Sequence, residues 1–524
     1  MAWLLDVGFW LIGLALTFLF GVLLLWFGLW GSRSKGRPRC PKCWYDMQGA
    51  PLEGAGSTVC PECGKDAGDR KRLFKNRRRW WAVVIGAVLI APSAYALNVL
   101  WGWSREQSVI ASVMSVREDI DGIFIRPYWL VDLLPWTFQK YFVRITELNA
   151  KVVDDRTLRK LLKLKNLTLL RVQESSITDE GIDLLFRFPY LTDLYFSSSE
   201  VSDRGLERLG YLPSLKKISL SGNRKITNAG LDALSELSSL QSLGLDNTLV
   251  TDDGLRQLTG LIHLKSLNLS DTSITDAGVK IVCREMPEVV QLFLGGTNMT
   301  DEGMRYIGNL KMLKTLQISE TSITDAGLIQ ITDLESLEML ILTGTNVGDA
   351  GMEKLSGLNN LWYLSIENTG VTDVGLAQLK NLPELSCLQL DCGQITGEAI
   401  KHINSMPSFD MLTLIGDSVT DDCLSLLVQL NSLNHLFLSE AQITDQGLKN
   451  IVNIPGLKFL GIQECDGITD AGLDHLANMP SLQHVGLSFL EKITPAGVEK
   501  LQQARPALQI VYFPNSEKAV SLGN

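Results

Sequence analysis

The segment LKSLNLSDTSITDAGVKIVCREMP, residues 264–287, decides the fold because its pattern returns every 24 or 25 residues. The frame LxxLxxLxLxxTxITDxGLxxLxxL recurs from Ile177 to Ile493 for about fourteen units, and Asp154-Asp155 begins a degenerate earlier copy. A unit this short cannot bury its own apolar face, so consecutive units must stack and share one continuous core. The sequence therefore predicts a solenoid over residues 144–513.

Each unit is expected to hold one strand and one short helix. Leu267 and Leu269 alternate with polar residues, which is the period-two pattern of a strand with one buried side. Asp276 precedes apolar residues at helical spacing through Ile281, which predicts a short helix that begins at a carboxylate cap. Thr272 sits where the chain leaves the strand, so its hydroxyl is expected to satisfy otherwise unpaired backbone groups.

On these residues the chain resembles the leucine-rich repeat family, in the ITDxGL variety seen in many bacterial proteins and in eukaryotic F-box repeat proteins. The resemblance covers about residues 144–513. It implies an α/β solenoid with a parallel sheet on the concave side and helices on the convex side. Apolar segments precede the repeats where the eukaryotic relatives have an F-box, so an F-box-like adaptor is the weaker alternative.

Two apolar runs, residues 4–30 and 80–103, are each long enough to cross a bilayer as a helix. Tryptophans at both ends of the second run are typical of a membrane interface. A cleaved signal peptide is the alternative for the first run. It is disfavoured because residues 1–6 carry no Lys or Arg and no small-residue cleavage site follows Trp30.

The segment between the runs, residues 31–79, has thirteen Lys or Arg against five Asp or Glu, a balance of +8. The positive-inside rule places this loop in the cytoplasm, which leaves the solenoid and both termini outside. Because the chain carries −10, the remainder sums to −18. Nucleic-acid binding by the basic residues is disfavoured, since membrane topology already explains them. Residues 104–143 are expected to link the second run to the repeats and cap them, and residues 514–524 to form a polar tail.

The same loop contains a predicted metal site, formed by Cys40, Cys43, Cys60 and Cys63. Two CxxC pairs sixteen residues apart can surround one zinc ion tetrahedrally, leaving no position for a substrate water. The segment 40–63 resembles a zinc ribbon, which implies a structural zinc ion. Two disulfides are the alternative, disfavoured because the loop is expected in a reducing compartment.

No arrangement in the repeats predicts catalysis. Cysteines at 283, 387, 392, 423 and 465 lie at scattered slots and are interpreted as buried thiols, with a Cys387–Cys392 bond disfavoured. His435 and His484 fall on outward strand positions two units apart, roughly 10 Å, which is too far for a shared metal. Because no nucleophile elbow, phosphate loop or HExxH motif occurs either, the protein is predicted not to be an enzyme.

The strand phase predicts which side chains line the concave surface, and several are aromatic or Met among small polar neighbours. Phe293, Tyr363, Phe437 and Phe459 are the predicted partner-binding anchors, because aromatic anchors in a polar surround are typical of protein interfaces. The predicted function is that of a membrane-anchored repeat protein that binds a protein or envelope ligand. The alternatives are a transmembrane receptor that couples ligand capture to the zinc ribbon, and an envelope scaffold.

Overall fold

The computed structural model describes residues 16–26, 40–42, 45, 47–48, 60, 62–63, 65, 83–90, 117–124, 143–212, 214–394, 396–513 and 520–522. The chain divides into two compact units. One consists of residues 1–114 and 121–146, and the other of residues 115–120 and 147–524. The repeats form the second unit.

The strands of the repeats form one sheet in which each strand pairs with its successor in sequence. From β2 to β17 every pairing is parallel. The strands are β1 (Arg117–Phe124), β2 (Val143–Asp154), β3 (Leu169–Ser176), β4 (Asp193–Phe196), β5 (Lys217–Ser219), β6 (Ser242–Gly244), β7 (Ser266–Asn268), β8 (Gln291–Phe293), β9 (Thr315–Gln317), β10 (Met339–Ile341), β11 (Tyr363–Ser365), β12 (Cys387–Leu390), β13 (Met411–Ile415), β14 (His435–Ser439), β15 (Phe459–Gln463), β16 (His484–Ser488), β17 (Gln509–Phe513) and β18 (Val520–Leu522).

A short α- or 3-10 helix follows each strand from β2 to β16. The α-helices are α6 (Asp155–Leu161), α7 (Asp179–Leu185), α8 (Asp203–Leu209), α9 (Asp252–Leu255), α10 (Asp276–Glu285), α11 (Asp301–Ile307), α12 (Asp325–Leu328), α13 (Asp349–Lys354), α14 (Asp373–Leu376), α15 (Gly397–Asn404), α16 (Asp421–Leu426), α17 (Asp445–Ile451), α18 (Asp470–Leu476) and α19 (Pro495–Ala504). Several turns are 3-10 helices: η3 (Asn228–Glu236), η4 (Arg256–Leu258), η5 (Ile329–Ile331), η6 (Leu355–Gly357), η7 (Leu379–Asn381), η8 (Cys392–Gln394) and η9 (Leu427–Gln429).

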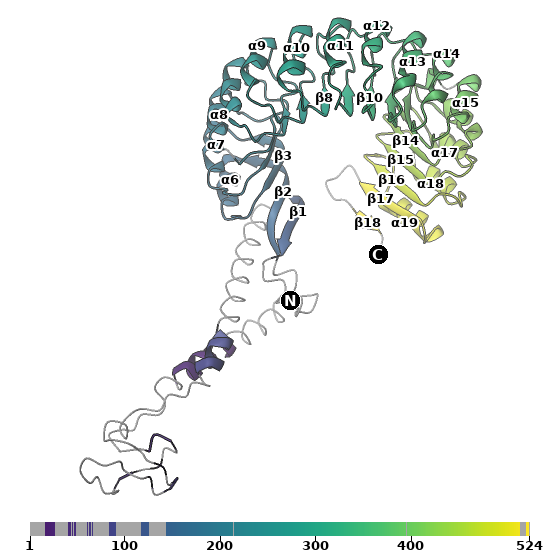
Figure 1. The fold of residues 1–524 in the computed structure, drawn as a ribbon. Coiled ribbons are helices and arrows are strands. Elements are labelled where there is room, and N and C mark those ends of the chain that lie inside the picture. Colours follow the sequence, from purple (N-terminus) through teal and green to yellow (C-terminus); the bar gives the residue numbers. More distant parts are fainter. Residues whose placement is uncertain are drawn as a thin grey trace. The chain divides into compact units, whose positions relative to one another are not determined.

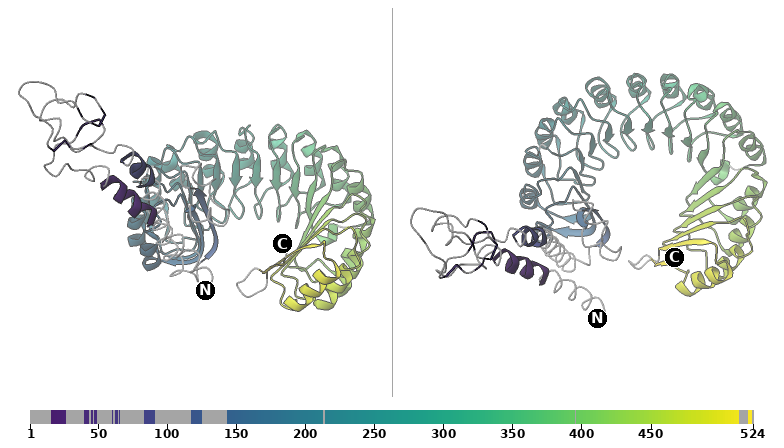
Figure 2. Two further views of the ribbon diagram at one scale, coloured as in Figure 1. Left: turned by 90° about the horizontal axis from the view of Figure 1, so that it is seen from below. Right: turned by 60° about the horizontal axis from the view of Figure 1, so that its bottom comes forward.

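The repeat unit is a solenoid, as the sequence predicts. Its strands line the inner, concave face of an arc and its helices cover the outer face (Figures 1 and 2). Leu267 and Leu269 are fully buried between these layers, and Leu267 stands in register with Leu243 and Leu292 of the neighbouring strands. The predicted alternation of buried and outward strand positions is therefore confirmed here.

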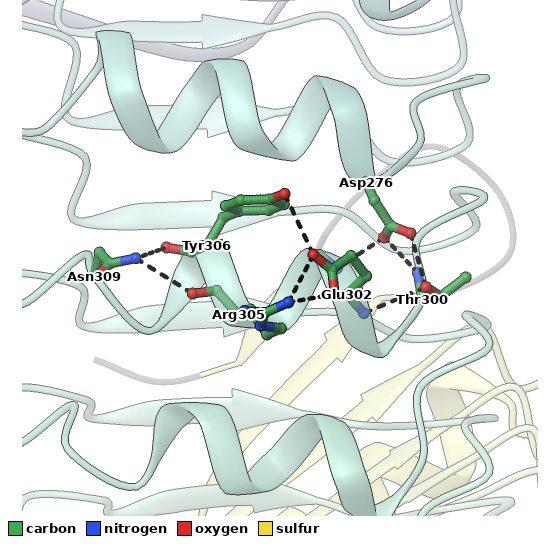
Figure 3. Close-up of polar contacts among 7 residues, drawn as sticks. Asp276, Thr300, Glu302, Arg305, Tyr306 and Asn309 are labelled. Carbon is green, nitrogen blue, oxygen red and sulfur yellow. Dashed lines mark hydrogen bonds and ion pairs between the residues drawn. The ribbon is translucent and has the colours of Figure 1, made fainter.

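The helix caps differ from the prediction. Thr275, rather than Asp276, is the N-cap of α10, and its hydroxyl oxygen accepts the Ala277 N–H at 3.2 Å. Asp276 is the first helical residue, and its carboxylate points toward the next unit (Figure 3). It accepts the Thr300 N–H at 2.8 Å, the Thr300 hydroxyl at 2.7 Å and the Gly303 N–H at 2.9 Å. The Asp of the motif is thus a connector between units.

This contact repeats along the solenoid, and we call it the Asp–Thr ladder. In each pair a carboxylate or amide oxygen accepts the N–H of the residue in the Thr slot of the next unit, 23 or 24 positions later. The acceptors with this bond are Asp155, Asp179, Asp203, Asn228, Asp252, Asp276, Asp301, Asp325, Asp349, Asp421, Asp445 and Asp470.

The ladder explains the Gly of the motif. A Cβ added at that position would lie 2.1–2.7 Å from the carboxylate or amide oxygen of the preceding unit, closer than real contacts allow. This holds at Gly181, Gly205, Gly230, Gly254, Gly278, Gly303, Gly327, Gly351, Gly375, Gly447, Gly472 and Gly497. Glycine is required there by a close approach between units.

Two units whose residues depart from the Asp-x-Gly motif follow the same rule. Gly397 occupies an Asp slot and offers no carboxylate, and the next unit has Cys423 where a glycine would otherwise stand. Ala399 also replaces the glycine, and among the described residues Asp373 keeps only the bond from the Thr396 hydroxyl, at 2.6 Å. Space for a side chain therefore appears where the carboxylate is absent or displaced.

The hydroxyls at the Thr272 slot act as predicted. Thr248, Thr297 and Thr321 each donate to the carbonyl oxygen three residues earlier at 2.6 Å, and Thr272 makes the same bond to Leu269. These threonines are buried. Each hydroxyl thus satisfies a carbonyl at the turn that follows its strand.

The C-terminal segment departs from the expected polar tail. Val520–Leu522 forms β18, which pairs antiparallel with β17. The pairing supplies hydrogen-bond partners to an edge strand that would otherwise be open. The solenoid sheet therefore ends on an antiparallel strand.

In the first unit, residues 16–26 and 83–90 are helical. Among the described residues no helix is both long and apolar enough to cross a membrane. The remaining parts of the two predicted spans, and residues 104–116 and 125–142 of the predicted linker and cap, lie outside the described residues. The two helical segments approach closely, because a Cβ added at Gly86 would lie 2.7 Å from the Gly21 carbonyl oxygen.

Candidate functional site

The concave face carries the four predicted anchors on four different strands. Phe293, Tyr363, Phe437 and Phe459 are all half-buried, so each presents part of its ring to solvent. Phe437 and Phe459 lie together, with ring centroids 5.0 Å apart. Phe293 on β8 and Tyr363 on β11 stand apart from them, separated by two strands from each other and by several from the pair. The four residues do not form a single patch.

The middle of the concave face is more closed than the strand phase predicts. Ser365, Glu367 and Cys387 occupy outward positions but are 0%, 7% and 1% exposed. Side chains from adjacent strands cover them: the Tyr363 hydroxyl donates to Gln389 Oε1 at 2.6 Å, and Gln389 Nε2 donates to Glu367 Oε2 at 2.7 Å. Burial raises the pKa of Tyr363 to about 12 and raises the pKa of Glu367. The Tyr363 hydroxyl is therefore part of a hydrogen-bond network with Gln389 and Glu367, and only its ring is left to contact a partner.

The last strands carry a compact aromatic group, which we call the aromatic patch: His435, Phe437, Phe459 and His484. His435, Phe459 and His484 stand in register on β14, β15 and β16. The Phe459 ring lies 6.1 Å from His435 and 6.2 Å from His484 between centroids, and it is stacked on the latter. The sequence places the two histidines too far apart to share a metal. The structure adds that a phenylalanine fills the space between them.

Two glycines shape the surface beside these rings. Phe437 Cδ1 lies 2.7 Å from where a Gly461 Cβ would be, so the Phe437 ring occupies the space that a side chain would take. A Cβ at Gly486, the next residue in register, would meet only Gly461 Cα within 4 Å. Beyond Gly486 in the same row, Val511 is 51% exposed. The space over Gly486, in the row between Gly461 and Val511, is therefore open, and we call this space the depression.

An acidic hollow of about 400 Å³ lies on the turns that follow strands β13 to β16. We call its carboxylates the acidic row: Asp417, Glu440, Glu464, Asp466 and Glu491. Gln442 and Phe489 complete the lining. Within the described residues none of the five carboxylates forms an ion pair. Uncompensated negative charge therefore gathers at this end of the sheet.

The turn residues at this rim lie in the left-handed region of backbone conformation. Glu440, Glu464 and Phe489 have φ values of 53°, 51° and 54°. Equivalent turn positions earlier in the solenoid share this conformation; Asn247 and Gly296 suit it, and Glu320 adopts it with a φ of 53°. Long acidic and aromatic side chains occupy these positions despite the less favourable conformation.

The opposite end of the concave face has different chemistry. Arg171 on β3 lies over the Tyr195 ring, 4.5 Å from its centroid. Lys217 on β5 forms a salt bridge with Asp193 at 3.2 Å, which raises the pKa of Lys217. The charged side chains named on the first strands are therefore occupied by partners within the protein, whereas the acidic row at the other end of the sheet has no ion-pair partner among the described residues.

Three of the four cysteines of the predicted metal site come together in the structure. Cys40, Cys60 and Cys63 have their Sγ atoms within 4.8 Å of one another, and Cys40 and Cys60 are fully buried. The N–H of Cys40 donates to the Tyr45 carbonyl and that of Cys60 to the Lys65 carbonyl, both at 2.9 Å, so Cys40 and Cys60 each begin a tight turn. Cys43, the fourth predicted ligand, lies outside the described residues.

The spacing of these sulfurs fits a zinc ion. Sulfurs bound tetrahedrally to zinc at about 2.3 Å lie about 3.8 Å apart. Cys40 Sγ and Cys63 Sγ are 3.9 Å apart, whereas a disulfide requires about 2.05 Å. This donor set of converging thiols suits a structural zinc ion that holds the two turns together.

Thiols in the repeats are poor nucleophiles as placed. Burial raises the pKa of Cys283 and of Cys387 to about 12, and that of Cys465 to about 11. Cys423 instead takes part in a disulfide bond, contrary to the interpretation of all five as thiols. Cys387 is a free thiol, so the disfavoured Cys387–Cys392 bond is absent, while the side chain of Cys392 lies outside the described residues.

Sequence reasoning missed the depression and the acidic row for one reason. Each feature comes from one position of the repeat that carries similar residues in successive units. For the depression these are Gly461 and Gly486 in the middle of the strand. For the acidic row and its neighbour they are Glu440, Glu464 and Phe489 just after the strand. The repeat frame marks these slots as variable and therefore uninformative. Comparing one slot across neighbouring units would have shown both features.

Comparisons with known proteins agree with this architecture. A model described as "Leucine-rich repeat region" matches residues 226–520, and one described as "Leucine Rich repeat" matches residues 211–235. No curated protein matches the chain in sequence.

Among solved structures, an internalin (inlF) of Listeria monocytogenes is 20% identical, covers 68% of this chain and 92% of its own, and has a TM-score of 0.39. The plant peptide hormone receptor RGFR1, solved in complex with RGF2, is 12% identical over 73% of this chain and 76% of its own, with a TM-score of 0.31. Internalin C2 of Listeria monocytogenes is 26% identical over 46% of this chain and 84% of its own, with a TM-score of 0.26. The match to the repeat-region model extends over more than half of the sequence, and the chain therefore belongs to the leucine-rich repeat family.

Proposed function

We propose that this protein binds a protein or cell-envelope ligand through the concave face of its solenoid while its N-terminal segments anchor it in a membrane. The observation that carries the proposal is the aromatic patch. Half-buried rings on a strand face, surrounded by small polar residues, have the composition of a hot spot rather than of a solvated surface.

The binding part of the proposal predicts that Phe459→Ala and Phe437→Ala weaken partner binding by about 2 kcal/mol each, because a truncated hot-spot ring loses a desolvated contact. The measurement is photocrosslinking of the partner from a probe placed at Ser439, with the full-length protein in envelope extract. Thermal melting of each variant accompanies it.

Leu267→Ala is the control for folding, because Leu267 is fully buried and its loss leaves a cavity. It should lower the melting temperature, whereas the ring variants should melt like the parent. The hypothesis fails if the ring variants melt early or if they crosslink the same partner as strongly as the parent.

Membrane anchoring is supported by the surface of the two N-terminal helical segments. Leu16, Leu23, Trp26 and Val88 are about 60% exposed, which is unfavourable in water for so many large apolar side chains on short helices. The basic loop between the segments favours a cytoplasmic position for the metal site. The disulfide at Cys423 is compatible with an oxidising, extracytoplasmic environment for the repeats.

This topology predicts opposite results for reporter fusions at two sites. A fusion at Gly56 should be active only with a cytoplasmic reporter, and one after Asn524 only with an extracytoplasmic reporter. Substituting Arg77, Arg78 and Arg79 together should weaken the orientation, because these positive charges lie next to the second apolar run. A C-terminal reporter that is active only in the cytoplasm would overturn the topology.

A further inference from the structure

We propose that the aromatic patch and the acidic row form one docking surface for a basic segment of a partner protein, an extended peptide with an aromatic or large apolar anchor followed by Lys or Arg. This inference rests on the proposed function and specifies the chemistry of the ligand. It differs from general concave-face binding because it assigns one end of the solenoid and one class of occupant.

The apolar half of the surface has a place for an anchor. The depression over Gly486 is open, and the Phe437 and Phe459 rings stand beside it 5.0 Å apart. A ring or a long apolar side chain placed over Gly486 could pack against these two rings, because aromatic contacts are favourable at centroid distances of about 4.5–7 Å. The backbone of Gly486 is free of positive φ, so the chain does not require a glycine there for its conformation. Its lack of a side chain instead leaves the depression empty.

The acidic row identifies the occupant. Glu464 follows Phe459 by five residues, or about 16 Å of extended chain, so a short extended peptide can reach both parts. Five carboxylates without ion pairs among the described residues favour cationic groups. Phe489, 49% exposed within the same hollow, offers a ring face for a guanidinium or ammonium group.

Charge elsewhere on the concave face argues for the same placement. At the beginning of the solenoid, Lys217 is already paired with Asp193, and Arg171 is occupied by the Tyr195 ring. A basic partner is therefore attracted to the end of the face and gains little at its beginning. Complementarity of this kind raises association rates and selects the partner's charge.

The test uses full-length protein and three fluorescent synthetic nonapeptides in a Gly-Ser background. The first carries two Phe and four Lys or Arg, the second replaces the basic residues with Glu, and the third replaces Phe with Ser. Fluorescence anisotropy should show the first binding at least about tenfold more tightly than either of the others. Its affinity should fall as salt is raised, because exposed charges are screened.

Two sets of variants examine the two halves separately. Gly486→Val fills the depression with a residue that suits a strand, and it should weaken the first peptide by about tenfold without lowering the melting temperature. Replacing Glu440, Glu464 and Glu491 together with Gln should weaken it similarly and reduce its salt dependence. The matched control replaces Glu207, Glu335 and Glu384 with Gln, which are exposed and distant from the row, and should bind like the parent.

Three results would overturn the inference: equal binding of the acidic peptide, parental binding by Gly486→Val, or the same loss in the control triple variant. The first would remove the charge preference, the second would reduce the surface to an unspecific acidic patch, and the third would reduce the effect to net charge. None of these results contradicts the proposed function, because crosslinking of the partner from Ser439 can still require Phe459. If Phe459→Ala crosslinks the same partner as strongly as the parent, the proposed function itself is refuted.

Discussion

Cys60→Ser is expected to abolish bound zinc in the full-length protein, which should otherwise hold about one zinc ion per chain. Cys60 is fully buried with its sulfur near those of Cys40 and Cys63, so a serine there removes a thiolate ligand and leaves a neutral hydroxyl. Structural zinc contributes apparent binding free energies of about 10–16 kcal/mol to small zinc modules, so the turns that begin at Cys40 and Cys60 should lose their structure. Metal analysis of purified protein measures the ratio directly.

Cys465→Ser serves as the matched control, because Cys465 is an equally buried free thiol in the solenoid. It should retain the zinc of the parent. The three-cysteine cluster is the sole candidate metal group among the described residues, so the whole-protein ratio reports on it. Parent protein with no zinc and with oxidised cysteines at 40, 43, 60 and 63 would contradict the assignment.

Gly278→Ala is expected to destabilise the solenoid by about 2–4 kcal/mol, opposite in sign to the usual effect. Alanine in place of glycine inside a helix normally stabilises by up to about 1 kcal/mol. Here the new Cβ would lie 2.3 Å from Asp252 Oδ1 and 2.9 Å from Ile274 Cγ2. The Asp252 carboxylate must then leave the Thr275 N–H and hydroxyl, which it accepts at 2.9 and 2.5 Å. Chemical denaturation of the full-length protein measures the change.

Gly397→Ala is the natural control, since an added Cβ there meets nothing within 4 Å. It should be neutral or slightly stabilising. Combining Gly278→Ala with Asp252→Ala should destabilise less than the sum of the two, because the clash and the lost bonds involve the same carboxylate. Additive effects would show that the ladder does not explain the glycine.

Most of the solenoid could be predicted from the sequence because its signals repeat. Leu267 and Leu269 are buried as their alternation predicts, and the Thr248 hydroxyl donates to a backbone carbonyl as expected. The role of Asp276 could not be predicted. A local view of the motif shows a residue that begins a helix, whereas its partner Thr300 belongs to the next unit, 24 positions away.

The binding surface was predictable only in part. Strand phase places Phe437 and Phe459 on the concave face, but it does not show that they touch or that Glu367 and Cys387 are covered. Those outcomes depend on side-chain size in adjacent strands, for example on Gln389 reaching back to Glu367. A one-dimensional pattern has no information on which neighbour fills the space.

The ladder also gives the solenoid a direction. Each acceptor lies in the earlier unit and each donor in the later one, so the two ends of a shortened array are not equivalent. Losing units from the C-terminal end leaves a carboxylate that water can solvate, and at α19 the chain has Pro495 in this slot, where no further helix follows among the described residues. Losing units from the N-terminal end would leave a threonine N–H and hydroxyl without their acceptor. The two ends of a shortened array would therefore expose groups of opposite character, hydrogen-bond acceptors at the C-terminal end and donors at the N-terminal end.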